Sequence, residues 1–184
     1  MSGKPQRIGY VVALCGIMSS LALVVMFVFG FVPTLEYLTP ALAGVLIYVI
    51  RESLGVKYGL VSYVAVGILC VLITSNYEVA MLFIFLLGYY PILREFLQKI
   101  KLRLLRGIVK FAVFTVSSLS CYGLLIYVFG MVYLLEEMNE FGQFGVVFVF
   151  ALSLAAFVAY DVFLGYFKPF YEKIIKPKIQ KRIR

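Results

Sequence analysis

The chain has 184 residues, of which 64% are hydrophobic, and its mean hydropathy is +1.03, whereas soluble globular domains contain about 45–50% apolar residues. A water-soluble fold of this size could not bury so much apolar surface, so the composition predicts an integral membrane protein with no room for a separate soluble catalytic domain. The formal charge of +8 comes from basic residues that lie in short clusters between apolar stretches, which favours cytoplasmic loops over a nucleic-acid-binding surface.

Six apolar stretches follow one another along the chain, and each is a candidate transmembrane helix. They are Ile8–Phe31, Tyr37–Ile50, Tyr58–Ile73, Val79–Leu93, Gly107–Leu135 and Phe144–Phe167. The fifth is expected to end near Val132. The second to fourth are shorter than the about 20 residues that cross a bilayer, so they extend into polar flanks, or one is tilted or interrupted. The sequence thus predicts an all-α membrane protein, residues 1–184 forming a single bundle of six transmembrane helices.

The distribution of charge orients these helices. All 17 basic residues fall in four segments that share one side of the membrane in a six-helix topology: 1–7, 51–57, 94–110 and 168–184. The loops on the other side carry no Lys or Arg: 32–36, 74–78 and 133–143. Basic loops are retained in the cytoplasm. This partition predicts that both termini are cytoplasmic (N-in, C-in), in a multi-pass protein of the cell membrane, expected to be the bacterial cytoplasmic membrane.

Two of the basic segments have a pattern of their own. Residues 94–110 keep apolar side chains at helical spacing, which predicts a basic amphipathic cytoplasmic helix. That helix lies on the anionic inner leaflet or docks a partner subunit through Phe96, Leu97 and Ile100. The tail, residues 168–184, is interrupted by Pro169 and Pro177 and is expected to act as a basic anchor.

Asp161 is the one acidic residue well inside an apolar stretch. A carboxylate within a membrane helix normally faces the bundle and has a partner, and Arg51 and Arg94 are candidates at a similar depth. Asp161 is then a structural link between helices, or part of a gate, a proton path or a partner-coupling site.

Polar and aromatic residues gather on the outer side and form the candidate substrate-binding set. They are Thr34, Glu36, Tyr37, Thr39, Asn76, Tyr77 and Glu78. Small-molecule sites combine apolar walls with a few placed polar groups, and these loops supply such a mouth. The alternative is that they are ordinary residues of the membrane interface, where tyrosine is common and loops are polar.

The fifth stretch carries a polar patch formed by Ser117, Ser118, Ser120 and Cys121. Such side chains usually hydrogen-bond to their own or a neighbouring helix, and contact with a ligand is the alternative. The whole sequence has no histidine, no CxxC pair, no Ser/His/Asp set and no P-loop glycine pattern. We therefore expect a protein that is not an enzyme and has no metal site and no cofactor.

Small residues recur at three-to-four spacing in the first and sixth stretches: Ala13, Gly16 and Ser20, and Ala151, Ala155 and Ala159. This spacing lets helix backbones approach closely. The contacts are made within the bundle or with another membrane subunit.

The segments Thr39–Gly44 (TPALAG) and Gly55–Leu60 (GVKYGL) resemble the membrane-embedded substrate-binding subunits, or S components, of energy-coupling factor transporters. The resemblance implies six helices with cytoplasmic termini and a substrate site that opens outward. A loop near Pro33–Thr39 would cap that site, and Ala13, Gly16 and Ser20 would face a transmembrane coupling subunit. It also implies separate ATPase subunits and a small solute, such as a vitamin, as substrate.

Two functions of other classes remain open. A non-catalytic scaffold of a cell-envelope complex, similar to the rod-shape determinant D family, has a comparable size and helix number. A flippase or exporter subunit is the third candidate. An outward-opening, ligand-sized pocket favours substrate binding, whereas a filled bundle with a groove along one lipid-facing side favours the scaffold.

Overall fold

The computed structural model describes residues 8–32, 35, 38–74, 76–131, 134, 144–177 and 179, and these form six long helices and no strand. Four of them are regular along most of their length: α1 (Ile8–Phe29), α2 (Leu38–Leu54), α3 (Val56–Ile73) and α6 (Arg103–Tyr127). The other two contain a π-helical turn: the run α4 (Tyr77–Leu82), Phe83–Leu87 and α5 (Tyr90–Gln98), and α8 (Gly145–Phe170) with its extension Tyr171–Ile175. The prediction of an all-α protein is confirmed for this part of the chain.

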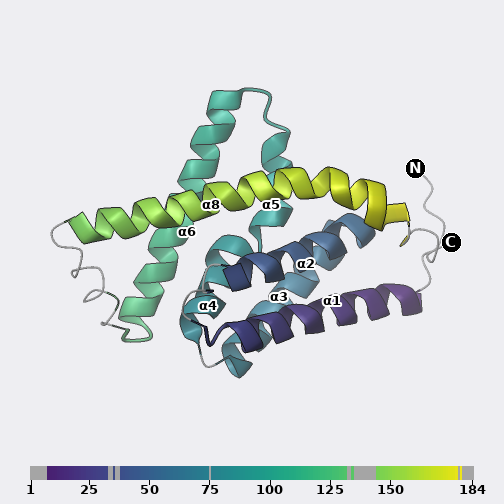
Figure 1. Ribbon diagram of the computed structural model, residues 1–184, viewed down its shortest axis with the longest axis horizontal. Helices are drawn as coiled ribbons and strands as arrows, with labels where there is room; N and C mark the ends of the chain where they lie inside the picture. The colour runs from purple at the N-terminus through teal and green to yellow at the C-terminus, as the bar shows by residue number, and fades with distance from the viewer. Residues whose placement is uncertain are drawn as a thin grey trace.

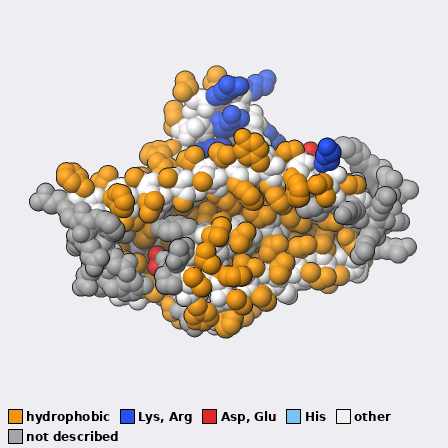
Figure 2. All heavy atoms as spheres, viewed as in Figure 1, with side chains coloured by type: hydrophobic (Ala, Val, Ile, Leu, Met, Phe, Trp, Pro, Cys, Tyr) orange, Lys and Arg blue, Asp and Glu red, His pale blue; other side chains and the backbone are white. Residues whose placement is uncertain are grey.

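Five of these helices are long and apolar enough to cross a membrane. They are α1, α3, the run Tyr77–Gln98, α6 and α8 with its extension as far as Ile174. The sixth, α2, has 17 residues and packs against both α1 and α3. Apolar side chains are spread over the described part of the face seen in Figure 2. Such a surface is stable only against lipid, so the chain is a multi-pass membrane protein.

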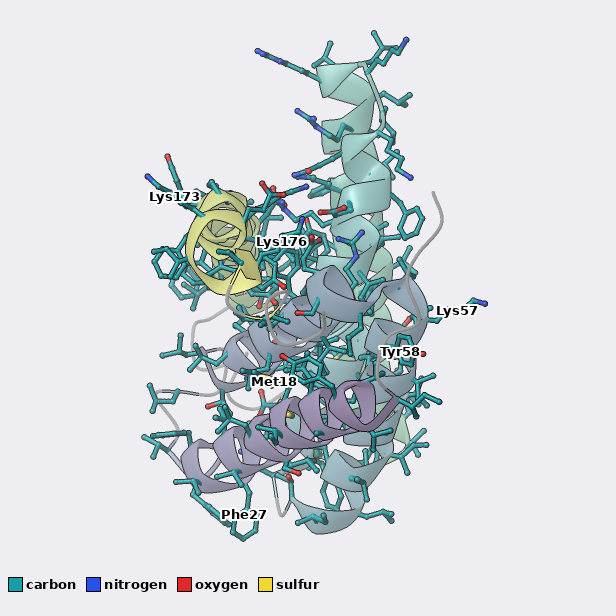
Figure 3. All side chains as sticks on the ribbon, turned by 90° about the vertical axis from the view of Figure 1, so that its right-hand side faces the viewer. Met18, Phe27, Lys57, Tyr58, Lys173 and Lys176 are labelled. Carbon is teal, nitrogen blue, oxygen red and sulfur yellow. The ribbon has the colours of Figure 1, made fainter. Side chains whose placement is uncertain are left out.

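The helices pack around two apolar cores that share α2 and the bent run Tyr77–Gln98. In Figure 1, α1, α2 and α8 run roughly along the long axis of the molecule, and α5 and α6 form a hairpin that projects from the body. One apolar core joins α1, α2, α3 and the bent run through residues such as Ala22, Ile47, Val66 and Phe83. The other joins α2, the bent run, α6 and α8 around Phe114 and Phe157. Outside these cores, Phe27 of α1 points away from the bundle (Figure 3).

The fourth predicted stretch is the one that is interrupted. Its π-helical turn ends where the amide of Gly88 donates to the carbonyl of Phe83, at 2.7 Å. A Cβ atom at Gly88 would lie 2.6 Å from that same oxygen, so only glycine fits. Pro91 then occupies the first turn of α5, where its missing N–H costs nothing. The short stretch therefore becomes a bent run of 22 residues.

Residues 94–110 are not one helix, and this prediction is wrong. Residues up to Gln98 complete α5, Lys99 to Leu102 form a turn, and α6 begins at Arg103. Leu102 has an extended backbone with ψ 115°, which ends the helical path. Apolar spacings of three and four persist on both sides of the turn because each half continues a membrane helix. The periodicity could not reveal the reversal between them.

The sixth helix also differs from its prediction, because it does not end at Phe167. α8 passes through Lys168 and Pro169 and continues as the π-helical turn to Ile175. Proline removes one backbone hydrogen bond, and the chain absorbs this by widening into the following π turn. The fifth stretch was expected to end near Val132, but α6 ends at Tyr127. Val132 itself lies outside the described residues.

Candidate functional site

Asp161 lies at the centre of a four-residue ion cluster between α5, α6 and α8. Its Oδ1 accepts from Nε of Arg94 and from the hydroxyl of Tyr90, both at 2.7 Å. Its Oδ2 accepts from Nζ of Lys110 at 2.5 Å. The Arg94 side chain is only 7% exposed, and those of Asp161 and Lys110 are 19% exposed. One carboxylate thus fixes three helices at one level.

A second ion cluster adjoins the first, because Glu95 follows Arg94 on α5. The carboxylate of Glu95 accepts from Arg51 of α2 and from Lys168 of α8, both at 2.8 Å. Arg51 also pairs with its neighbour Glu52. We call the seven charged residues of both clusters the charged belt: Arg51, Glu52, Arg94, Glu95, Lys110, Asp161 and Lys168.

Aromatic rings pack against the charged belt from inside the bundle. The ring of Tyr90 meets Phe157 edge-on, with centroids 4.5 Å apart, and Phe157 in turn packs on Phe114 at 5.1 Å. These rings cover the bundle side of the first cluster, whose Asp161 and Lys110 side chains are 19% exposed. Because ion pairs strengthen as the local dielectric constant falls, and unpaired charges become costly, the belt holds α2, α5, α6 and α8 in one arrangement.

Of the two arginines predicted as partners for Asp161, the structure brings Arg94 to it and directs Arg51 to Glu52 and Glu95 instead. Sequence reasoning missed Tyr90 and Lys110. Lys110 was grouped with the cytoplasmic bases, although it lies inside the predicted fifth stretch, Gly107–Leu135, and this was the signal that its ammonium could reach the bundle.

A small cavity lies on the other side of the same aromatic cluster, between α2, the bent run, α6 and α8. It measures about 30 Å³, and its walls are Ala41, Leu82, Leu86, Leu87, Ser118, Tyr122, Ser153, Ala156, Phe157 and Tyr160. This volume holds about two water molecules. Any larger ligand needs the helices around the cavity to separate.

Ser118 adds a polar group to the wall of this cavity. Its side chain is buried, and its hydroxyl has no hydrogen-bond partner in the structure. The other serines of the same patch are satisfied, since Ser117 bonds to Tyr89 and Ser120 to the carbonyl of Val116 in its own helix. An unpaired buried hydroxyl costs about 1–3 kcal/mol, so a polar group of a ligand or a water that reached Ser118 would be stabilised there.

The predicted substrate-binding residues are distributed differently. Thr34, Glu36 and Tyr37 lie outside the described residues. Among the described ones, none lines the cavity. Thr39 is buried at the start of α2, Tyr77 packs on Phe129 with ring centroids 5.0 Å apart, and Glu78 lies in the first turn of α4.

Asn76 has a structural contact that the sequence did not indicate. Its Oδ1 accepts from the amides of Glu78 and Val79, which caps α4, and its Nδ2 donates to the carbonyl of Gly30 at 3.0 Å. We expect Asn76→Ala to lose about 1–2 kcal/mol of stability, because it removes both the cap and the link to the end of α1. Asn76→Asp keeps the acceptor and loses the donor. Its midpoint of thermal unfolding in detergent should therefore fall between those of the unaltered protein and of Asn76→Ala. Equal midpoints for all three proteins would contradict this role.

The residues predicted to dock another subunit divide between exposed and buried positions. Ala13, Gly16 and Ser20 share an exposed face of α1, and a Cβ on Gly16 would meet nothing within 4 Å. Phe96 is 46% exposed, whereas Leu97 is buried and Ile100 packs against the protein's own core. A partner that approaches α1 therefore finds small residues uncovered, whereas on α5 only Phe96 of this set is available.

Comparison with protein-family models, with curated proteins and with solved structures finds no match to this chain.

Proposed function

We propose that the chain is the substrate-binding membrane subunit of a multi-subunit transporter for a small solute such as a vitamin, as the resemblance to S components implies. The observation that carries this proposal is the interior cavity beside the unpaired hydroxyl of Ser118. A buried polar group that faces an apolar cavity is a typical anchor for a small ligand. In this proposal all six helices cross the bilayer and both termini are cytoplasmic.

The exposed small residues of α1 support a partner in the same membrane. Helices associate in lipid through close backbone contact, and Ala13, Gly16 and Ser20 leave the α1 surface open to such contact. In the proposed complex a coupling subunit packs there, and ATPase subunits on separate chains drive delivery. The substrate enters from the outer side, and the cavity opens when α6 and α8 separate above the charged belt.

The test compares two serines of α6, Ser118 and Ser120, which lie less than one helical turn apart. The full chain is purified in mild detergent from membranes, and small molecules released by denaturation are identified by mass spectrometry. We expect Ser118→Ala to reduce the amount of copurified ligand by up to about tenfold, the value of one lost hydrogen bond. Ser120→Ala is the matched control, because Ser120 bonds to its own helix on the exposed side.

The proposal fails if the unaltered protein releases no molecule that is enriched over a membrane protein purified in parallel. It also fails if Ser118→Ala and Ser120→Ala retain the same ligand equally. In that case the small volume of the cavity favours the second candidate, a non-catalytic scaffold of a cell-envelope complex. Copurification with envelope enzymes in place of a coupling subunit and ATPases would support that scaffold.

A further inference from the structure

The tip of the α5–α6 hairpin combines charge and apolar surface in a way that the bundle does not use. Leu102 is 68% exposed and Leu104 is 84% exposed. Three exposed bases alternate with them: Lys99, Lys101 and Arg103. Figure 2 shows basic side chains gathered on this projection beside apolar ones. No acidic residue occurs in the sequence between Glu95 and Glu136, so no neighbouring residue along the chain neutralises the bases of the tip.

The charged belt places this tip near one surface of the membrane. Along α8, Asp161 lies about 24 Å from Gly145, at 1.5 Å per residue, and the hydrocarbon core is about 30 Å thick. Arg94 and Lys110 pair with Asp161 at the base of the hairpin. The hairpin projects from the body at a steep angle to α8 (Figure 1). Arg103 lies about 10 Å from Lys110 along α6, at 1.5 Å per residue, so the tip stays near the membrane surface at which the charged belt lies.

We propose that the hairpin tip, residues 99–106, is a binding surface for anionic phospholipid in the cytoplasmic leaflet. The leucines enter the boundary between headgroups and acyl chains, and the bases pair with the phosphates above them. An interfacial helix buries its apolar face about 5–10 Å into this boundary, which supplies both chemistries within one side-chain length. A purely polar acidic surface would satisfy the bases but would leave Leu102 and Leu104 in water.

Charge complementarity makes the preference measurable. Each basic residue near an anionic surface favours binding by about 1 kcal/mol, or a factor of about five in the local lipid population. Three bases therefore make phosphatidylglycerol the main neighbour of the tip even when it is the minority lipid. Since these interactions act through solvent, they weaken as the Debye length falls from about 10 Å at 0.1 M salt to about 3 Å at 1 M.

The test places a fluorophore on the tip and a quencher on one lipid at a time. The full chain carries Leu104→Cys and Cys15→Ala, the other two cysteines being buried, and is labelled with bimane in nanodiscs. Two nanodisc preparations have the same proportions of phosphatidylglycerol and phosphatidylcholine, with bromine on the acyl chains of one or of the other. We expect brominated phosphatidylglycerol to quench more strongly at 0.1 M salt, and the difference to shrink at 1 M.

Two matched controls separate this surface from general membrane contact. Lys101→Gln with Arg103→Gln should abolish the lipid preference, whereas Lys173→Gln with Lys176→Gln, at the end of α8 (Figure 3), should keep it. The second control carries the label at Tyr127→Cys. Tyr127 is 89% exposed and lies at the far end of α6, so this label should show no preference between the two lipids.

Absence of quenching by either lipid would overturn the proposal, because the tip would then lie in water or against protein. Equal quenching by both lipids would also overturn it, since the bases would have no anionic partner. If the neutral variant does not fold, the salt series on the unaltered bases decides the question. A preference that persists unchanged at 1 M salt contradicts the electrostatic pairing.

Discussion

Replacement of Asp161 by asparagine is expected to destabilise the bundle by about 3 kcal/mol or more. The change leaves Arg94, whose side chain is 7% exposed, and Lys110 without their shared counter-ion. Removal of one partner from a buried ion pair typically costs 3–5 kcal/mol, because the remaining charge is not rehydrated. The measurement is the unfolding equilibrium in mild detergent, followed by titration with a denaturing detergent and by loss of the monodisperse peak on gel filtration.

The control is Glu172→Gln, which removes one negative charge from the exposed extension of the same helix. It should leave the unfolding midpoint unchanged. The double variant Asp161→Asn with Lys110→Gln should recover part of the loss, because one of the two unpaired cations is then absent. If Asp161→Asn were as stable as the unaltered protein, the belt would not hold α5, α6 and α8 together.

Gly44→Ala is expected to have the second largest effect, about 1–3 kcal/mol or more, through steric overlap. An added Cβ at Gly44 would lie 2.5 Å from the carbonyl oxygen of Leu87 and would also overlap the hydroxyl of Tyr160. Leu87 accepts from Tyr160 at 3.2 Å, so α2, the bent run and α8 meet at this glycine. The backbone oxygen cannot rotate away, so α2 has to move outward from both neighbours.

Gly123→Ala is the matched control for Gly44→Ala. Gly123 lies in α6, and a Cβ there would meet nothing within 4 Å. Alanine in a helix interior is favoured over glycine by about 1 kcal/mol, so this variant should be as stable as the parent or more so. Thermal unfolding of the two variants side by side separates crowding from helix propensity. A loss of equal size in both would show that Gly44 is not at a close contact.

The sequence predicted the helices well and their partners poorly, for one physical reason. Hydropathy identifies the segments that lie in an apolar environment, so the all-helical fold and the need of Asp161 for a partner could be predicted. The choice of Arg94 over Arg51 depends on the rotation of α5 about its axis. The π-helical turn Phe83–Leu87 adds one residue to the helical path and rotates every later side chain by about 100°.

The candidate site shows the same limit. Ser118 was one of four polar residues that the sequence placed together, and their spacing does not distinguish them. What sets Ser118 apart is that Tyr89 reaches Ser117 and Ser120 bonds to Val116, whereas the buried Ser118 faces the cavity. The hairpin turn at residues 99–102 was missed because apolar spacing continues on both sides of it. Such features depend on tertiary contacts, which a single sequence does not display.

The charged belt has a consequence for the order in which the protein is made. Arg94, Glu95 and Lys110 leave the ribosome 51–73 residues ahead of the α8 residues with which they pair, Asp161 and Lys168. Until α8 enters the bilayer, Arg94 and Lys110 lack their counter-ion Asp161 at the membrane boundary. Their final depth is therefore fixed only when α8 is inserted, because α8 supplies Asp161 and Lys168 to the charged belt.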